Sequence, residues 1–455
     1  MFKFYVALYI AKLAEFTLKL LRRNASYFPG KIAVTICPDF LGKIDKPKRI
    51  IAVTGTNGKT TVCNLIIDSL EKSGIKVLNN KLGANINAGV ATSLINGVNM
   101  GNKTKFETAV LEVDERSSLK IYPYIKPNYI VCTNLFRDSV KRNAHPEYIS
   151  EIINKAIPKD TTLILNADDL ISSSLGKDNK KVFFAIDKLD SDLTESINII
   201  NDVRICPKCH TELKYNYVRY HHIGNAYCPN CDFKSPEADY LVKEINYDKN
   251  YMIVKNKEKE IKYSLISDSI FNLYNEICAI TLLSEIGIEQ DEIQKQIENI
   301  KIVESRYQKE NINGINMVTN LAKGQNPVAC SCVFNYVKKE LGKKEIILIV
   351  DDFFDNNGSS ENLTWIYDCD FEFLNDESIE RIIIGGKRSQ DYYLRLLLAG
   401  VPKEKIFYSK DESKTPDYLS LEKDKTIYIL FDMYNQAIVD NVKKIIKNKI
   451  LGKEN

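Results

Sequence analysis

One glycine-rich loop carries the clearest chemical signal in the sequence. Its members are Gly55, Thr56, Asn57, Gly58, Lys59, Thr60 and Thr61. Glycines let the backbone approach a phosphate, and the N–H groups of the loop and of a following helix direct positive partial charge at it. In such loops the lysine reaches the β- and γ-phosphates and the next hydroxyl binds Mg²⁺. The loop therefore predicts ATP and Mg²⁺ as cofactors, held by Lys59 and Thr60. Val53 stands where the general Walker pattern has its first glycine, so we identify the shorter GTNGKTT variant.

A metal bound at such a loop also needs a carboxylate, and one acidic stretch follows a predicted strand. Glu112, Asp114 and Glu115 come at the end of the strand predicted for residues 108–113. The carboxyl ends of the strands form the ligand-binding edge of an open α/β sheet. We predict Glu112 as the Mg²⁺ ligand, with Asp114 or Glu115 as the second choice. The alternative is an acidic turn in solvent.

Four of the eleven cysteines form two Cys-X-X-Cys pairs separated by eighteen residues. The four are Cys206, Cys209, Cys228 and Cys231. Two such pairs supply the tetrahedral cage of four sulfurs that structural Zn²⁺ prefers. We predict a zinc ribbon over about residues 203–235, with a closed metal site that has no catalytic role. The odd number of cysteines favours a reducing cytoplasm over a secreted, disulfide-bonded protein.

Histidines and tyrosines lie between the two cysteine pairs. They are His210, His221, His222, Tyr215, Tyr217, Tyr220 and Tyr227. We predict that the histidines are surface groups or neighbours of the site rather than ligands, because four thiolates already complete a zinc shell. We predict that the tyrosines build the core of a small ribbon. The alternative is stacking on RNA bases beside Arg219.

Composition bounds the class of protein. The 455 residues suggest about three domains, and 44% hydrophobic with 27% charged residues is typical of a globular protein. These values exclude a disordered chain, a collagen-like fibre and a polytopic membrane protein. The net charge of +3 leaves no overall basic field, so we expect no nucleic-acid partner.

Strands that alternate with helices must position these motifs. The predicted strands are residues 49–54, 108–113, 129–133, 162–166 and 182–186, and a helix is predicted at 62–73. This alternation predicts βαβ units and a mostly parallel sheet. The later predictions are a β-hairpin at 242–264 with its turn at 248–250, a helical region from 262 to about 302, and a last α/β region with strands near 346–350, 381–385 and 426–431.

The first 21 residues predict an amphipathic helix. Lys12, Glu15 and Lys19 interrupt the apolar residues at helical spacing, so no stretch is long enough to span a bilayer. No small-residue cleavage site follows. We expect this helix to pack on the body of the protein. The alternative is a helix lying on the membrane face, which the basic end at residues 19–23 suits.

Several motifs together resemble those of the Mur ligases, ATP-dependent enzymes that join carboxylates to amines. The GTNGKTT loop follows a strand and precedes Glu112, and residues 271–275 (FNLYN) are similar to the middle-domain signature of the family. The inserted four-cysteine ribbon and three further stretches resemble the MurT branch of the family. These stretches are residues 133–138 (TNLFRD), 165–169 (LNADD) and 365–368 (WIYD). The resemblance covers nearly the whole chain.

The resemblance implies an α/β fold with three parts. These are an N-terminal helix and lead-in over residues 1–48, a Mur-ligase-like central P-loop domain over 49–305 that contains a parallel sheet and the inserted zinc ribbon, and a Rossmann-like α/β domain over 306–455. It also implies that Asn272 and Asn275 contact the nucleotide or orient its loop. Arg306 matches the position of an arginine that helps to hold ATP at a domain junction.

The resemblance implies the ligase subunit of a lipid II isoglutaminyl synthase. Such a subunit activates the α-carboxyl of D-glutamate in the stem peptide of lipid II as an acyl phosphate. A partner class I glutamine amidotransferase, bound as a heterodimer, supplies the ammonia that forms D-isoglutamine for peptidoglycan. The implied location is the cytoplasm, with peripheral contact at the inner face of the membrane as the finer expectation.

One departure from the family lies at Asn362, where the family has an aspartate that completes the partner's glutaminase site. An asparagine orients a histidine by hydrogen bonding but supplies no negative charge to stabilise an imidazolium. Asp355 and Glu361 are candidate substitutes. The alternatives are therefore a divergent Mur-like ligase that uses another amine or amino acid, and a non-catalytic ATP-binding scaffold.

Overall fold

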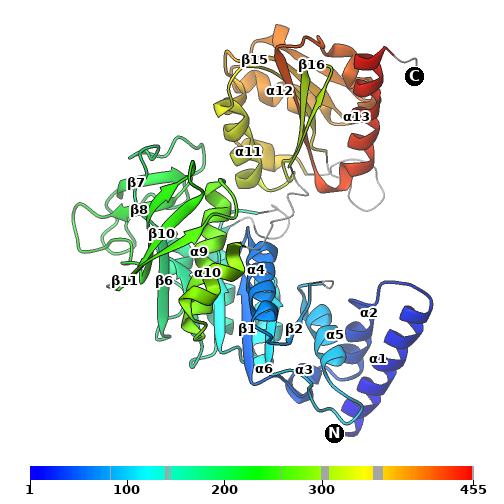
Figure 1. Cartoon of the computed structure of the whole chain (residues 1–455), viewed down its shortest axis with the longest axis vertical. Helices are drawn as coiled ribbons and strands as arrows, with labels where there is room; N and C mark the ends of the chain where they lie inside the picture. The colour runs from blue at the N-terminus through cyan, green and yellow to red at the C-terminus, as the bar shows by residue number, and fades with distance from the viewer. Residues whose placement is uncertain are drawn as a thin grey trace. The chain divides into compact units, whose positions relative to one another are not determined.

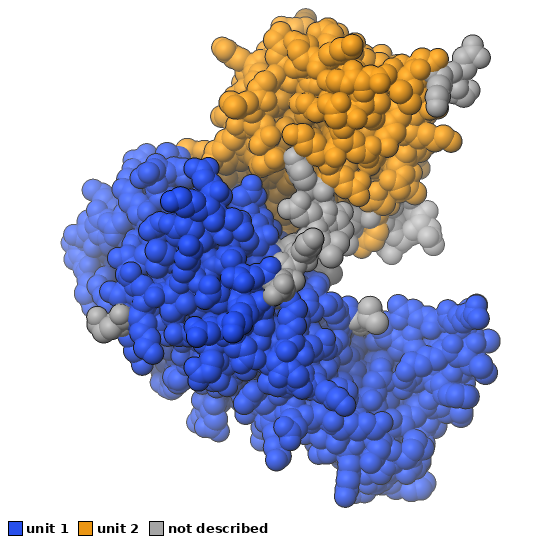
Figure 2. Space-filling view, viewed as in Figure 1, with its two compact units in different colours: residues 1–136, 145–196, 202–302 blue, residues 137–144, 197–201, 303–455 orange. Residues whose placement is uncertain are grey.

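The computed structural model describes residues 1–81, 84–138, 143, 145–257, 259–298, 307–351 and 362–452. The described residues form two compact units (Figure 2). Those within 1–136, 145–196 and 202–302 make the first unit, and those within 137–144, 197–201 and 303–455 make the second. Arg306, Asp355 and Glu361 lie outside the described residues.

A nine-stranded sheet is the frame of the first unit (Figure 1). Its strand order is β11-β10-β9-β6-β5-β4-β1-β3-β2. The strands from β9 to β2 pair in parallel, whereas β10 and β11 pair antiparallel at one edge. The strands are β1 (Arg49–Thr54), β2 (Val77–Asn79), β3 (Thr108–Glu112), β4 (Tyr129–Cys132), β5 (Thr162–Asn166), β6 (Lys181–Ile186), β9 (Tyr240–Asn246), β10 (Tyr251–Asn256) and β11 (Lys259–Ser264). The prediction of a mostly parallel sheet is confirmed.

Helices and a separate hairpin complete the first unit. The helices are α1 (Phe2–Leu20), α2 (Phe28–Ile36), α3 (Phe40–Lys43), α4 (Lys59–Lys72), α5 (Asn87–Gly97), α6 (Ser118–Ile125), α7 (Pro146–Ala156), α8 (Leu170–Ser173), α9 (Ile270–Glu285) and α10 (Gln290–Glu298), and the hairpin is β7 (Lys214–Tyr220) with β8 (Ile223–Tyr227). Phe4 of α1 and Phe40 of α3 belong to the same buried cluster as Ala52 of β1 and Leu111 of β3. The N-terminal helices therefore share a hydrophobic core with the central sheet.

The local sequence explains why these elements form where they do. Residues 50–54 of β1 are all buried, as expected of a central parallel strand covered by helices on both faces. Residues 247–250 form the predicted turn between β9 and β10, with Asn250 at a φ of +53°. The prediction of helix from residue 262 is wrong for 262–264. These residues end β11, which pairs antiparallel with β10, and α9 begins only at Ile270.

The second unit contains a six-stranded sheet in the order β12-β13-β17-β14-β15-β16. The β12–β13 pair is antiparallel and the other pairs are parallel. Its elements are β12 (Tyr307–Ile312), β13 (Ile315–Leu321), α11 (Pro327–Lys339), β14 (Lys343–Ile349), β15 (Ile379–Gly385), α12 (Ser389–Leu398), β16 (Ile406–Ser409), β17 (Lys425–Phe431) and α13 (Gln436–Leu451). Two apolar clusters, one with Phe334 and Trp365 and one with Ile347 and Val442, form its core. Sequence analysis predicted only three of these strands.

Candidate active site and metal centre

The glycine-rich loop is the turn between β1 and α4, at the carboxyl edge of the sheet. Gly55 and Gly58 have φ angles of +125° and +89°. A Cβ on Gly55 would lie 2.3 Å from the Thr133 hydroxyl, and one on Gly58 would lie 2.1 Å from Oδ1 of Asn275. Both positions therefore require glycine. Helix α4 begins at Lys59. The first N–H groups of a helix make no hydrogen bonds within it, so a helix N-terminus suits a phosphate.

A second loop holds the glycine-rich loop in this conformation. The N–H groups of Thr56 and Asn57 donate to the backbone oxygen and to Oδ1 of Asn134, at 2.8 and 3.0 Å. The N–H of Phe136 donates to the Thr56 hydroxyl at 2.9 Å, and the Thr133 hydroxyl donates to the Asn57 carbonyl at 2.6 Å. The side chain of Thr56 is thus used to fix the loop.

The structure brings Thr60 and Glu112 together across 52 residues of sequence. The Thr60 hydroxyl donates to Oε2 of Glu112 at 2.8 Å, and the Asn85 amide donates to Oε1 at 3.0 Å. The Asn80 side chain makes two hydrogen bonds with the backbone of Glu112. Its amide N–H donates to the Glu112 carbonyl and its amide oxygen accepts from the Glu112 N–H, both at 2.8 Å. A hydroxyl and a carboxylate side by side offer the hard oxygen ligands that Mg²⁺ requires, so these residues fit the predicted metal.

The other two carboxylates of the acidic stretch have different partners. Glu115, only 2% exposed, accepts from Nζ of Lys59 at 2.7 Å. Asp114 accepts from the N–H groups of Arg116 and Ser117 and so caps the short 3₁₀ turn at Glu115–Ser117. Among the three predicted carboxylates, Glu112 is therefore the one that lies beside Thr60.

Helix α9 places the asparagines of the family signature near the loop. Asn275 packs on Gly58, and its Nδ2 lies 3.4 Å from Oδ1 of Asn272, to which it donates. Asn272 in turn donates to the Ser267 hydroxyl at 3.2 Å. Asn275 therefore touches the phosphate loop directly, whereas Asn272 is one residue further away.

Replacing Gly58 by alanine should lower the affinity for ATP about tenfold or more, because the new Cβ would overlap Asn275 and move the loop. Isothermal titration with ATP measures the effect. Gly287→Ala is the matched control, since Gly287 has a φ of +88° and open space around it. Both variants carry backbone strain of about 1 kcal/mol, so equal losses of ATP affinity would contradict the packing role of Asn275.

Helix α9 also buries a carboxyl group that the predicted mechanism does not use. Burial raises the pKa of Glu276 from its ordinary 4.5 to about 8, although the Ile266 N–H, 3.2 Å away, favours the ionised form. The folded protein therefore holds a proton that the unfolded chain releases. This contribution to stability is full below about pH 4.5 and is lost as the pH rises through 8, at roughly 1 kcal/mol per pH unit.

Glu276→Gln, which mimics the protonated acid, should therefore raise the Tm at pH 8 and change it little at pH 5. Thermal unfolding at both pH values tests this. The exposed Glu298→Gln is the control and should leave the pH dependence unchanged. A Tm gain that is equal at both pH values would show that the Glu276 carboxyl does not titrate in this range.

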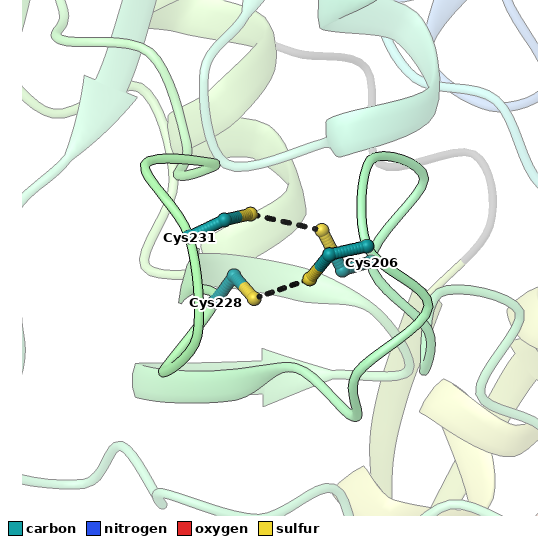
Figure 3. Close-up of side chains that lie close together, drawn as sticks. Cys206, Cys228 and Cys231 are labelled. Atoms are coloured by element: carbon teal, nitrogen blue, oxygen red, sulfur yellow. Dashed lines mark hydrogen bonds between the residues drawn. The ribbon is translucent and has the colours of Figure 1, made fainter.

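The four predicted zinc ligands converge on one point. Their Sγ atoms all lie within 4.8 Å of one another, with 3.6 Å between Cys206 and Cys231 and 3.3 Å between Cys209 and Cys228. Figure 3 shows the labelled cysteines approaching one another from two separate loops. A tetrahedral Zn²⁺ with bonds of about 2.3 Å holds its sulfurs about 3.8 Å apart. The sulfur cluster thus has the dimensions of a zinc site, whereas a disulfide needs about 2.05 Å.

Backbone and charge at the cluster also suit a cation. The N–H groups of Lys208 and Asn230 donate to the sulfurs two residues earlier, Cys206 and Cys228, both at 3.4 Å. Hydrogen bonds from Thr211 lower the pKa of Cys209 to about 5. The Phe233 N–H favours the Cys231 thiolate, but desolvation and the neighbouring sulfurs raise the Cys231 pKa to about 12. Metal binding requires deprotonated thiols, and Zn²⁺ would supply the positive charge that offsets the repulsion between crowded thiolates.

The histidine predictions are partly wrong. His221 and His222 are each 1% exposed, so they are buried rather than surface groups. They lie at the turn of the β7–β8 hairpin, and the sulfur cluster found among the described residues contains no histidine. Tyr215, Tyr217 and Tyr220 are buried too, and Tyr215 belongs to the small core that includes Cys206 and Cys228. Tyr215 therefore agrees with the prediction of a ribbon core. The Tyr217 hydroxyl instead donates to Asp168, and the Tyr220 ring stacks on Phe136, so these two side chains lie outside that core.

A buried ion-pair network that sequence analysis missed ties the ribbon to the sheet. Arg219 of β7 contacts Asp168 and Asp192, both at 3.0 Å, and all three side chains are at most 3% exposed. The hydroxyls of Tyr217 and Tyr274 donate to Asp168 at 2.8 and 2.6 Å. Burial opposes the charged form of Arg219, but the adjacent carboxylates outweigh it and raise the pKa of the guanidinium above its ordinary value. The motifs around Asp168 and Tyr274 were both noted in the sequence, but nothing local links them to Arg219.

His222 connects the same hairpin to the loop that holds the phosphate-binding turn. Its Nε2 lies 3.1 Å from Oδ1 of Asp169, whose Oδ2 accepts from the Leu135 N–H at 2.8 Å. Although burial opposes ionisation, the adjacent His222 holds the pKa of Asp169 below its ordinary value. Leu135 is flanked by Asn134 and Phe136, which bind the phosphate loop. Two successive contacts, from His222 to Asp169 and from Asp169 to Leu135, therefore connect the ribbon hairpin to the loop that holds the glycine-rich turn.

In the second unit, Asn362 lies two residues before a short 3₁₀ turn at Thr364–Tyr367. Its Oδ1 accepts from the N–H of Thr364 at 3.0 Å and from the Thr364 hydroxyl. Asn326 caps α11 by accepting from Ala329 and donates to Asp138 at 3.1 Å. The amide oxygen of Asn362 thus has a local structural role, and the predicted role toward a partner stays a prediction.

Comparison with known proteins now decides the family. Residues 53–231 match the Mur ligase middle domain and residues 323–435 match the MurT ligase C-terminal domain. The MurT subunit of the glutamine-hydrolysing lipid II isoglutaminyl synthase of Staphylococcus aureus is 31% identical over 91% of this chain and 93% of its own length. The chain belongs to the MurT family. The corresponding MurT subunit of Streptococcus pneumoniae is 29% identical to it over 92% of each chain.

Solved structures show that this MurT-family chain has the Mur ligase fold. A pseudomurein peptide ligase type C from Methanothermus fervidus matches 90% of this chain and 81% of its own, with a TM-score of 0.67 and 20% identity. The MurF ligase of Thermotoga maritima, solved with ADP, matches 93% of this chain and 84% of its own, with a TM-score of 0.59 and 14% identity. The predicted family and α/β fold are confirmed.

Proposed function

We propose that the chain is the ATP-dependent ligase subunit of a lipid II isoglutaminyl synthase. It would activate the α-carboxyl of D-glutamate in the stem peptide of lipid II as an acyl phosphate. Ammonia from a class I glutaminase partner would then displace phosphate and give D-isoglutamine. The observation that carries this proposal is the contact of Thr60 with Glu112 beside Lys59, in a chain that matches MurT subunits over nearly its whole length.

The side chains of the loop supply positioning and charge rather than covalent chemistry. Lys59 would turn from Glu115 to the γ-phosphate as the substrate carboxylate attacks in line. The N–H groups at the start of α4 would hold the other phosphate oxygens. Thr60 and Glu112 would hold Mg²⁺, which neutralises charge on the β- and γ-phosphates. Placement and electrostatic stabilisation of this kind account for most of the catalysis of phosphoryl transfer.

The test is reconstitution with a class I glutaminase from the same organism. We expect a stable heterodimer that amidates lipid II in the presence of ATP and glutamine, detected by mass spectrometry of the stem peptide. The chain alone should use free ammonium instead of glutamine. Absence of ATP-dependent amidation under both conditions would overturn the proposal.

The second candidate, a Mur-like ligase that uses another amine or amino acid, is favoured by Asn362 in place of the family aspartate. Asn362→Asp separates the two. If a glutaminase supplies the ammonia, this change should raise the glutamine-driven rate and leave the ammonium-driven rate unchanged. Asn375→Asp, at an exposed position, is the control. Incorporation of an amino acid in place of ammonia would favour the second candidate.

A further inference from the structure

Helix α1 is apolar on two opposite faces. The inner face packs into the core through Phe4, Ala7, Leu8 and Ala11. The outer stripe, as we name it, consists of Phe2, Tyr9, Leu13, Phe16 and Leu20. At 100° per residue these five side chains fall within about 60° of the helix circumference, nearly opposite the inner face. Packing on the body therefore leaves the five residues of the outer stripe unexplained.

The outer stripe is well exposed. Phe2 is 83% exposed, Leu13 66%, Phe16 65% and Leu20 73%. Figure 1 shows α1 at the margin of the first unit, with α2 and α5 along its inner side. Isolated apolar residues on a surface are common, but a continuous stripe along five turns of one helix is typical of an interaction site.

The charged residues around the outer stripe are mostly basic. Residues 1–36 contain six basic residues and one acidic residue, a formal charge of +5, so the rest of the chain carries −2. The single acid, Glu15, is buried and paired with Lys19. Lys3, Arg22 and Arg23 are exposed. The apolar stripe is thus bordered by cations without exposed acids, which matches an anionic surface.

Packing fixes the helix before anything binds to it. Nζ of Lys12 donates to the carbonyls of Ile95 and Val98, both at 2.8 Å, at the end of α5. Together with the inner face, these bonds set the rotation of α1 and hence the direction of the stripe. A preformed surface of this kind loses little conformational entropy on binding.

We propose that the outer stripe of α1 is a docking surface for an anionic phospholipid bilayer. The helix, about 28 Å long, would lie along the membrane surface with the stripe among the acyl chains and the cations at the headgroups. Among the described residues, no helix is long and apolar enough to cross a membrane. The reason for docking rests on the proposed function, because a lipid-linked substrate is confined to the bilayer.

Self-association of two chains through their outer stripes is disfavoured by charge. Two copies would bring together two regions of charge +5, and like charges across an interface oppose association. An acidic protein partner would bind the stripe in the absence of lipid, so the experiment below separates that case from the proposal.

The test is co-sedimentation of the full chain with vesicles of phosphatidylcholine alone or mixed equally with phosphatidylglycerol. We expect the wild-type chain to bind the anionic vesicles about tenfold more tightly than the neutral ones. Leu13→Gln/Phe16→Gln should lose at least about tenfold in affinity. The control Leu341→Gln/Leu398→Gln, at exposed apolar positions of the second unit, should bind like wild type.

Ammonium-driven amidation of detergent-dispersed lipid II is measured on the same proteins, and we expect no loss in Leu13→Gln/Phe16→Gln. This readout keeps failure of docking distinct from failure of the proposed function. Absence of wild-type binding, or equal binding by wild type and Leu13→Gln/Phe16→Gln, overturns the proposal. The proposal is also overturned if Leu13→Gln/Phe16→Gln changes the oligomeric state or the affinity for a protein partner but does not reduce vesicle binding.

Discussion

Lys59→Ala is expected to lower the rate of ATP-dependent amidation by about a thousandfold. The ammonium of Lys59 is the cation that lies within the glycine-rich loop, where it contacts the Thr56 carbonyl at 3.4 Å and Glu115 at 2.7 Å. Without it, the charge that develops on the γ-phosphate loses its preorganised partner, and losses of this size follow when such groups are removed. Phosphate release during amidation measures the effect.

The same substitution also affects stability. Glu115 is 2% exposed, and removal of Lys59 leaves its carboxylate buried without its cation. Breaking a buried pair in this way costs about 3 kcal/mol. A loss of activity by Lys59→Ala alone would therefore not distinguish lost chemistry from lost folding.

A double variant separates these two effects. Lys59→Met/Glu115→Gln removes both charges and should recover most of the Tm while activity stays about a thousandfold below wild type. Lys120→Ala, at an exposed position of α6, is the control for loss of a lysine. Turnover close to wild type in the folded double variant would rule out the proposed nucleotide site.

Cys206→Ser/Cys209→Ser is expected to lower the zinc content from about one ion per chain to less than about a tenth. The two sulfurs that remain cannot form a closed tetrahedral site. The ribbon core that includes Cys206 and Cys228 is small, so it depends on the metal more than the sheet does. We expect the Tm to fall by about 5–10 °C.

The effect of metal loss should reach the nucleotide site. The β7–β8 hairpin carries Arg219, which binds Asp168, and lies next to His222, which binds Asp169. Asp169 in turn holds the N–H of Leu135. A disordered hairpin would release this loop, so we expect weaker ATP binding by the double serine variant, measured by titration at a temperature well below its Tm.

Cys37→Ser is the matched control for this experiment. Its thiol already donates to Asp39 at 3.1 Å, a bond that a serine hydroxyl maintains. Zinc content and ATP affinity should both match wild type. An unchanged zinc content in Cys206→Ser/Cys209→Ser would show that the metal is held elsewhere, and an unchanged ATP affinity after metal loss would contradict the link through Asp169.

Much of the fold could be predicted because its signals are local. The strands at residues 49–54 and 162–166 each contain a continuous apolar run, at 50–53 and 163–165, and the structure has both strands with the predicted bounds. The strand β12 was missed because Tyr307–Ile312 is largely polar and lies at the sheet edge, where hydrophobic pattern is weak. Residues 262–264 fall in both the predicted β-hairpin and the predicted helical region, and their pairing with β10 decides for the strand.

The candidate site also combines features with local signals and features that depend on tertiary contacts. The sequence by itself determined the phosphate loop and the two cysteine pairs, because each is a short motif whose spacing dictates its chemistry. Only the tertiary structure decided which carboxylate meets Thr60, since Glu112 and Glu115 are equally acidic in sequence and the register of β3 beside β1 separates them. It likewise buried His222 against Asp169 and left the outer stripe of α1 exposed. Contacts between residues far apart in the chain depend on how the sheet and helices pack, which local residue patterns do not specify.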